Sequence, residues 1–237
     1  MQEKIDLADI KQKIFTMFEK KGWGKVFKPF IFSYDFDNII YKLVNESNKN
    51  KRFTPPLKNV FKAFEECAYD ELQIIIVNNH VYPYFGAADG LAFSCSQTQK
   101  ISPDLQHILN EINRTVYKGH PGSLDVNLKR WANQGILLLN TSLTTTVDKY
   151  GQHEDIWYLF IDYLFEYLNK HETGLIYIYM NEDSKWIEMI DENKNYKFTV
   201  KHPGIFKSIK KGRWDSDNLF NKVSDLVLKL RNYKINW

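Results

Sequence analysis

The chain has few of the features that define disulfide-stabilised, zinc-binding or membrane-spanning proteins. Cys67 and Cys95 are the only cysteines among 237 residues, and they form no CxxC motif. This usage indicates neither a disulfide framework nor a structural zinc site. No run approaches the roughly 18 apolar residues that span a bilayer, and residues 1–20 lack the apolar stretch of a signal peptide. We therefore expect a soluble, reduced, cytoplasmic protein with no metal, no cofactor and no membrane partner.

An excess of one charge sign is also missing. The formal net charge is +3, which is too small to identify a nucleic-acid-binding protein by itself. Four basic residues do fall within seven positions: Lys207, Lys210, Lys211 and Arg213. Such a run is as typical of a solvated loop as of a phosphate-binding surface, so its neighbours decide between the two.

Aromatic residues, by contrast, are abundant, at 15% of the chain. The length suits one large α/β domain over residues 1–237 better than two small ones. Residues 1–52 are expected to form a helical segment packed on it, because Ile10, Ile14, Phe15 and Phe18 recur at helical spacing.

Four short apolar runs predict strands that alternate with helices. Ser102 and Pro103 are typical of a helix start, with serine as N-cap and proline in the first turn. The expected strands are 74–77, 136–139, 175–180 and 196–200, and the expected helices include 57–67, 124–133, 156–168 and 217–233. Alternation of this kind implies parallel pairing with right-handed crossovers. We expect a doubly wound, four-stranded parallel sheet flanked by helices.

Amide and imidazole side chains follow the predicted strands. They are Asn78, Asn79 and His80 after the first, Asn140 after the second, Asn181 after the third and His202 after the fourth. Any one alone is more typical of a cap or a turn. Ligands bind beyond the carboxyl ends of parallel strands, so the shared placement predicts a common pocket at one edge of the sheet.

Five motifs in order make the chain resemble the family 1 uracil-DNA glycosylases from about Phe53 to Trp237. They are the lead-in 53–64 (FTPPLKNVFKAF), Gly90–Ser94 (GLAFS), Trp131–Asn140 (WANQGILLLN) with Leu143–Thr144, His202–Pro203, and the terminal Ile235–Trp237 (INW). The resemblance implies a DNA glycosylase of that fold, which flips its target base out of the DNA.

The chain also departs from the family pattern G-Q-D-P-Y-H. By alignment with this pattern, His80 occupies the place of the catalytic aspartate. The other departures are Asn78 for the glycine, Val81 for the proline, Pro83 for the histidine, Gly204 and Ile205 for Ser-Pro, Phe206 for the leucine wedge and Asp104 for a serine expected to contact phosphate.

The resemblance assigns roles to the residues that are retained. Asn140 is the amide that reads the base, and Phe93 is the ring that stacks on it. His202 is the donor to the pyrimidine O2, where negative charge develops as the glycosidic bond breaks. Tyr82 stands where the family tyrosine excludes C5-substituted pyrimidines.

Loss of the aspartate removes a fixed negative charge from beside a cationic transition state. A neutral imidazole still accepts a proton from water, and an asparagine can position that water. We therefore interpret Asn78, Asn79 and His80 as a joint replacement for the aspartate. The alternative is a catalytically dead site.

The resemblance also gives the basic run a function. Phe206 is interpreted as a wedge that fills the gap left by the flipped base. Lys207, Lys210, Lys211 and Arg213 are then expected to hold phosphates beside it. The alternative places Phe206 in the core.

Three functional hypotheses follow for what we expect to be a monomer acting on DNA. The first is a glycosylase for a C5-modified pyrimidine, such as hydroxymethylated or glucosylated cytosine in viral DNA, with a role in antiviral defence, because Val81 and Pro83 rebuild the loop around Tyr82. The second is a catalytically silent module that binds DNA or a replication partner. The third is a slow but ordinary uracil repair enzyme.

Overall fold

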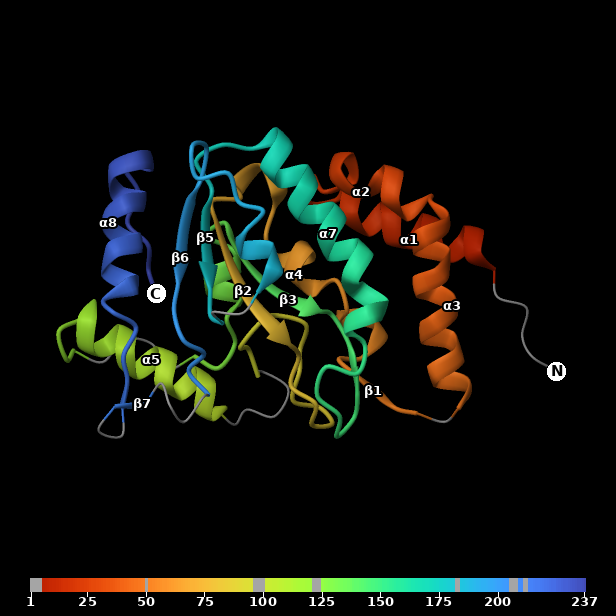
Figure 1. Cartoon of the computed structure of the whole chain (residues 1–237), viewed down its shortest axis with the longest axis horizontal. Helices are drawn as coiled ribbons and strands as arrows, with labels where there is room; N and C mark the ends of the chain where they lie inside the picture. The colour runs from red at the N-terminus through yellow and green to blue at the C-terminus, as the bar shows by residue number, and fades with distance from the viewer. Residues whose placement is uncertain are drawn as a thin grey trace.

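The computed structural model describes residues 6–49, 51–95, 101–120, 125–181, 184–204 and 213–237, together with the backbone of 209–210. A four-stranded parallel sheet lies between two groups of helices (Figure 1). The α-helices are α1 (Leu7–Glu19), α2 (Gly24–Ile31), α3 (Tyr34–Asn48), α4 (Lys62–Glu66), α5 (Pro103–Thr115), α6 (Lys129–Ala132), α7 (Glu154–His171) and α8 (Leu219–Arg231). This architecture confirms the predicted fold class.

The sheet has the order β3-β2-β5-β6, and all its neighbouring strands are parallel. Its members are β2 (Ile74–His80), β3 (Ile136–Ser142), β5 (Ile176–Tyr179) and β6 (Tyr196–Thr199). Two short antiparallel ribbons pair β1 (Phe53–Thr54) with β4 (Thr145–Thr146) and β7 (Ile209–Lys210) with β8 (Arg213–Trp214). Single 3₁₀ turns lie at η1 (Leu57–Asn59), η2 (Tyr69–Glu71) and η3 (Lys185–Ile187).

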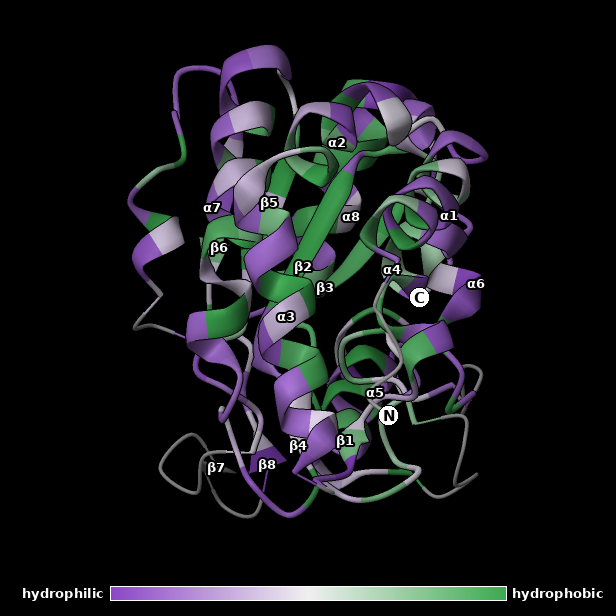
Figure 2. Cartoon of the chain, turned by 90° about the vertical axis from the view of Figure 1, so that its right-hand side faces the viewer, coloured by the Kyte–Doolittle hydropathy of each residue, from purple (hydrophilic) through white to green (hydrophobic). Residues whose placement is uncertain are grey.

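The interior strands form because their side chains are apolar on both faces. Ile74, Ile75 and Ile76 of β2 are fully buried, as is the Ile136–Leu139 run of β3. Burying each such side chain contributes about 1.5–3 kcal/mol. Figure 2 shows these strands as the hydrophobic centre of the molecule, with hydrophilic residues on the outer faces of the helices.

The helices cover both faces of the sheet. Helix α7 packs against β3, and α2 and α3 pack against α7. Helices α5 and α8 lie on the other side of the sheet in Figure 1. Cys67 and Cys95 are both buried. No helix in the described part of the chain is long and apolar enough to cross a membrane.

Several predicted boundaries were wrong. The helix predicted over 57–67 is broken into η1 and α4, and the one predicted over 124–133 shortens to α6 within its described part. The strand predicted over 74–77 continues to His80, because β2 and β3 keep pairing through Asn78↔Asn140 and His80↔Ser142. Asn78, Asn79, His80 and Asn140 therefore belong to the strands and do not follow them.

Candidate active site

The side-chain amide of Asn78 joins two residues that are distant in the sequence. Its Nδ2 donates to Oδ1 of Asn140 at 2.9 Å and to the carbonyl oxygen of His80 at 2.8 Å. Its Oδ1 lies 3.1 Å from Nε2 of His202. Asn78 and Asn140 are both buried, so the bond between their side chains is shielded from water. The structure thus brings Asn78, Asn140 and His202 together at the carboxyl end of the sheet.

The hydrogen bonds of His202 assign its tautomer. The backbone N–H of Gly204 donates to Nδ1 at 3.0 Å, so the ring proton lies on Nε2 and is donated to Asn78. Burial lowers the pKa of His202 from its usual value; nearby Asp104 opposes that shift and His80 adds to it. His202 is therefore a neutral imidazole that presents an N–H donor.

Phe93 lies beside His202, and its backbone has a conformation that residues other than glycine rarely adopt. Its φ is 65°, which costs a non-glycine residue about 1–3 kcal/mol. Its buried ring lies 5.8 Å from the ring of His202, between centroids, at an interplanar angle of 37°. The strained backbone thus holds an aromatic face at the edge of the site.

The loop that carries Phe93 is tied down by a buried carboxylate. Asp89 accepts from the hydroxyl of Ser94 at 2.6 Å and from the backbone N–H of Leu91 at 3.1 Å. A Cβ on Gly90 would lie 2.0 Å from the carbonyl oxygen of Asn59. Glycine is therefore required at this position for the loop to pack as it does.

Tyr82 is held against the same loop. Its hydroxyl lies 2.5 Å from Oγ of Ser102 and 3.5 Å from the carbonyl oxygen of Phe93. Burial, followed by the nearby charge of Asp104, raises the pKa of Tyr82 above its usual range. The flanking Val81 and Pro83 are buried. Tyr82 is thus a neutral phenol fixed by both of its oxygen contacts.

Two departures from the family pattern occupy neighbouring positions. A Cβ on Gly204 would lie 2.4 Å from Oδ1 of Asp104 and 3.2 Å from Nδ1 of His202. Glycine at 204 therefore makes room for the Asp104 carboxylate beside His202. Burial raises the pKa of Asp104, whereas His202 and His107 act in the opposite direction. Sequence reasoning noted both substitutions without linking them.

Among the described contacts, the side chain of His80 makes no hydrogen bond to Asn78, Asn140 or His202. Its Nε2 lies 3.3 Å from Oε1 of Glu154, the first residue of α7. The carbonyl oxygen of Asn79 accepts from the hydroxyl of Thr141 at 3.1 Å. Asn79 and His80 line a cavity of about 400 Å³ between the ends of β2 and β3, the start of α7 and residues 184–186. Asn78 therefore contacts Asn140 and His202, whereas Asn79 and His80 line a neighbouring cavity. Glu154 was missed by sequence reasoning because no motif joins it to His80.

The predicted DNA-contacting residues are mostly outside the described part of the chain. Phe206, Lys207 and Lys211 lie outside it, and only the backbone of Lys210 is described, in β7. Arg213 is exposed in β8. Their roles stay predictions. Within the described residues, no group of three or more His, Cys, Asp or Glu side chains could hold a metal ion.

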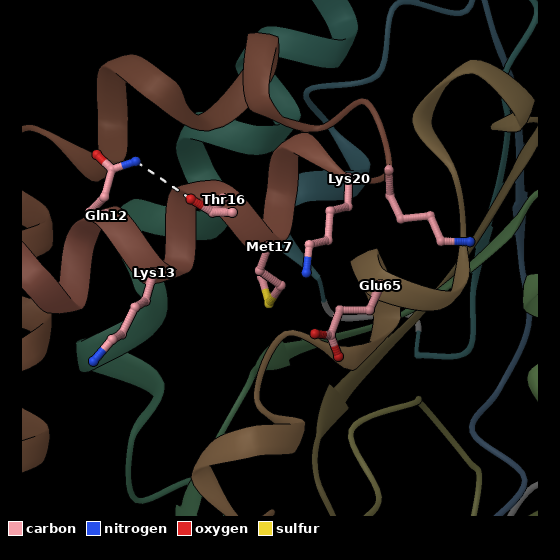
Figure 3. A pocket seen from close by; sticks show the side chains of 7 residues that line it. Gln12, Lys13, Thr16, Met17, Lys20 and Glu65 are labelled. Atoms are coloured by element: carbon pink, nitrogen blue, oxygen red, sulfur yellow. Dashed lines mark hydrogen bonds between the residues drawn. The ribbon is translucent and has the colours of Figure 1, made fainter.

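A second hollow, of about 470 Å³, is remote from these residues. It is lined by the outer face of α1 and by Glu65 of α4 (Figure 3). Gln12 donates to the hydroxyl of Thr16 at 3.4 Å along its rim. None of the candidate site residues lines it, so it is separate from the site at the sheet edge.

Several curated proteins are similar to the chain over most of its length. A uracil-DNA glycosylase from Aliarcobacter butzleri is 30% identical over 196 residues, covering 82% of this chain and 90% of that protein. One from Mesomycoplasma hyopneumoniae is 30% identical over 204 residues, covering 85% and 90%. One from Amoebophilus asiaticus is 29% identical over 215 residues, covering 89% and 96%. No family profile matches the chain.

Solved structures share the fold. The crystal structure of mimivirus uracil-DNA glycosylase superposes with a TM-score of 0.81 at 20% identity, covering 91% of this chain and 85% of that one. The enzyme from Nitratifractor salsuginis superposes with a TM-score of 0.60 at 15% identity, covering 84% and 90%. At these identities the likeness establishes the fold alone.

Proposed function

The chain belongs to the uracil-DNA glycosylase family and is a hydrolase of N-glycosyl bonds, and we propose that it acts on a pyrimidine other than plain uracil. In this proposal it flips a C5-modified pyrimidine out of DNA and hydrolyses the bond to the deoxyribose, leaving an abasic site. Hydroxymethylated or glucosylated cytosine in viral DNA is the proposed substrate class, and defence against such viruses is the proposed role.

The position of Asn78 is the observation that carries this proposal. Its amide fills the space between Asn140 and His202, the two groups that the resemblance assigns to reading the base and assisting its departure. A base that takes both the Asn140 oxygen and the Nε2–H of His202, as N3–H and O2 of uracil would, must displace both Asn78 bonds. Two hydrogen bonds contribute about 1–3 kcal/mol net, so a base with no compensating contacts binds up to roughly 100-fold more weakly.

The same contact supports a cytosine-type base. Because Nδ2 of Asn78 donates to Oδ1 of Asn140, the Asn140 oxygen is turned toward Asn78. The Asn140 nitrogen is then the group positioned to donate, and a donor suits N3 of cytosine, which is an acceptor. N3 of uracil carries a hydrogen and would need the oxygen instead.

The retained residues support hydrolysis by the family chemistry. The neutral His202 ring presents its Nε2–H, which is the donor that a departing pyrimidine O2 requires as negative charge develops. Phe93 presents a ring beside it.

DNA is the proposed partner of this site. Phe206 is proposed as the wedge, and Lys207, Lys210, Lys211 and Arg213 as phosphate contacts. Together the four cations would give affinity a steep dependence on salt. Substituting Arg213→Ala and Lys210→Ala together should weaken binding of every DNA tested and lower the salt slope by about two.

The deciding experiment is base release from a panel of oligonucleotides. Each carries one uracil, thymine, cytosine, 5-hydroxymethylcytosine or glucosylated 5-hydroxymethylcytosine, and abasic sites are read by alkaline cleavage. We expect cleavage of a modified cytosine substrate well above that of uracil. Cleavage of uracil alone would favour the ordinary repair enzyme, and DNA binding without any release would favour the silent module. The Asn140→Ala variant serves as the control for background cleavage.

A further inference from the structure

The two ring nitrogens of His80 have contrasting surroundings. Nε2 faces Oε1 of Glu154 at 3.3 Å. Nδ1 is buried and has no hydrogen-bond partner among the described residues. Buried polar atoms without a partner are uncommon and costly, so each one needs a physical reason. A partner that arrives with the substrate, such as the attacking water, supplies that reason.

We propose that Glu154 is a positioning residue, which orients His80 so that Nδ1 serves as the general base of the hydrolysis. The inference rests on the proposed glycosylase function and names how the missing aspartate is replaced. The Glu154 carboxylate oxygen lies 3.3 Å from Nε2, so its negative charge favours the tautomer with the proton on Nε2 and the lone pair on Nδ1. A carboxylate holding an imidazole tautomer in this way is the logic of a hydrolytic triad.

The hydrolysis in this proposal uses one water molecule and the side chains of His80, Glu154 and His202. The water oxygen forms a bond to C1′ of the deoxyribose as the C1′–N bond breaks. The electron pair of that bond leaves with the pyrimidine, whose O2 accepts from Nε2–H of His202. The water proton passes to Nδ1 of His80, and the resulting imidazolium is paired with Glu154. Solvent later protonates the released base and deprotonates His80.

Local structure places the Glu154 carboxylate where this role requires it. His153 immediately precedes α7, and its ring lies 2.8 Å from Oγ1 of Thr144 and 3.2 Å from Oγ1 of Thr146. Trp157 Nε1 donates to the same Thr144 hydroxyl at 2.7 Å. These buried contacts tie the first turn of α7 to the segment that follows β3.

Gly151 provides the space in which the side chains of His80 and Glu154 meet. Its φ is +63°, and a Cβ there would lie 2.4 Å from Oε1 of Glu154 and 3.3 Å from Cε1 of His80. The ionisable groups near His80 are Glu154, Asp155 and Lys185, which line the same cavity, and His202 after β6, which becomes harder to protonate when His80 is charged. Among them, Glu154 is the acid within ion-pair distance of His80, and it therefore stabilises a His80 imidazolium most directly.

The test compares Glu154→Gln with Asp155→Asn. Both acids lie in the first turn of α7 and line the same cavity. The two variants therefore remove the same charge from the same helix end, but only Glu154 pairs with His80. On the cleaved oligonucleotide, we expect Glu154→Gln to lower the single-turnover rate by roughly 10²-fold or more. Asp155→Asn should stay within about twofold of wild type, and DNA affinity should change little in either.

A spectroscopic measurement separates this role from a loss of packing. Nitrogen-15 NMR of the His80 ring should show a proton on Nε2 in the wild-type protein and in Asp155→Asn, and a mixture of tautomers in Glu154→Gln. Wild-type protein that releases no base from any oligonucleotide would overturn the proposed function. Active wild type with an unchanged rate in Glu154→Gln, or with the same His80 tautomer in both proteins, would overturn the role of Glu154 alone.

Discussion

Oδ1 of Asn78 lies 3.1 Å from Nε2 of His202, although 124 positions separate the two residues. The Asn78 amide continues to Asn140 on the neighbouring strand, so one protein side chain holds both groups that a flipped pyrimidine would contact. A glycine, as in the family pattern, would leave both groups free. Position 78 is therefore where we expect substrate choice to be decided.

Asn78→Gly should raise uracil excision. Removing the amide frees Asn140 and His202, and we expect kcat/KM on a uracil oligonucleotide to rise by about 10- to 100-fold, the equivalent of the two lost hydrogen bonds. Asn79→Gly is the matched control, because it introduces the same backbone freedom one residue along β2. Equal or lower uracil activity in Asn78→Gly would show that the amide does not compete with the base.

Asn140→Ala and His202→Ala should each lower the single-turnover excision rate by about 10²-fold or more, with DNA affinity largely retained. One residue reads the base and the other stabilises its departure, so the loss belongs to the chemical step. Quenched-flow cleavage and fluorescence anisotropy on the same samples separate rate from binding. Unchanged rates in both variants would mean that these residues are relics of an ancestral site.

His80→Asp should gain some uracil activity and lose selectivity for a bulkier base, while His80→Ala should only lose activity. The gain should be limited, because the new carboxylate would face Glu154, and like charges at close range disfavour ionisation. The double variant His80→Asp with Glu154→Gln should exceed His80→Asp alone on uracil. An inactive wild type together with a competent His80→Asp would instead support the silent module.

The free energy of unfolding should fall as the pH drops below about 6.5. Burial lowers the pKa of His153 from its ordinary value of 6.5, so the unfolded chain binds more protons than the folded chain once the pH falls below that value. Stability is therefore present above this pH and is lost on acidification, by at most about 1.4 kcal/mol per pH unit for one group. Burial lowers the pKa of His202 too, which adds to the loss.

Urea unfolding at pH 7.5 and 5.5 measures this effect. His153→Gln should be less stable at pH 7.5, because contacts to Thr144 and Thr146 are lost, but it should show a smaller difference between the two pH values. His120→Gln, at an exposed position, should keep the wild-type difference. An equal pH dependence in wild type and His153→Gln would contradict the prediction.

The sheet was predictable because its signal is local. Runs such as Ile74–Val77 and Ile136–Leu139 are apolar on both faces, and helices separate them, which together indicate a parallel sheet. The ends of the strands were not predictable from the same runs. The pairing of Asn78 with Asn140 is a contact between strands, and no local pattern shows that it extends the ladder over polar residues.

The sequence predicted which residues form the candidate site better than it predicted the contacts between them. Strand ends and family motifs pointed to Asn140, Phe93 and His202 without giving their contacts. Asn78 and Glu154 act through residues far from them in sequence, so their roles emerge only when the fold brings the pairs together. A glycine three residues before an acid at a helix start is the one local hint of Glu154, and it is too common to be specific.

The reactivity of the two buried thiols can report local opening of the folded protein. Cys67 is fully enclosed, and burial raises its pKa to about 12; burial also raises the pKa of Cys95. A thiol that is both buried and protonated does not react, so a thiol-reactive dye can label these positions only after the chain opens around them. Trp23 donates to the carbonyl oxygen of Cys67 under the N-terminal helices, whereas Cys95 lies two residues beyond Phe93. Labelling rates at the two positions would thus report local opening beneath the N-terminal helices separately from opening of the loop that carries Phe93.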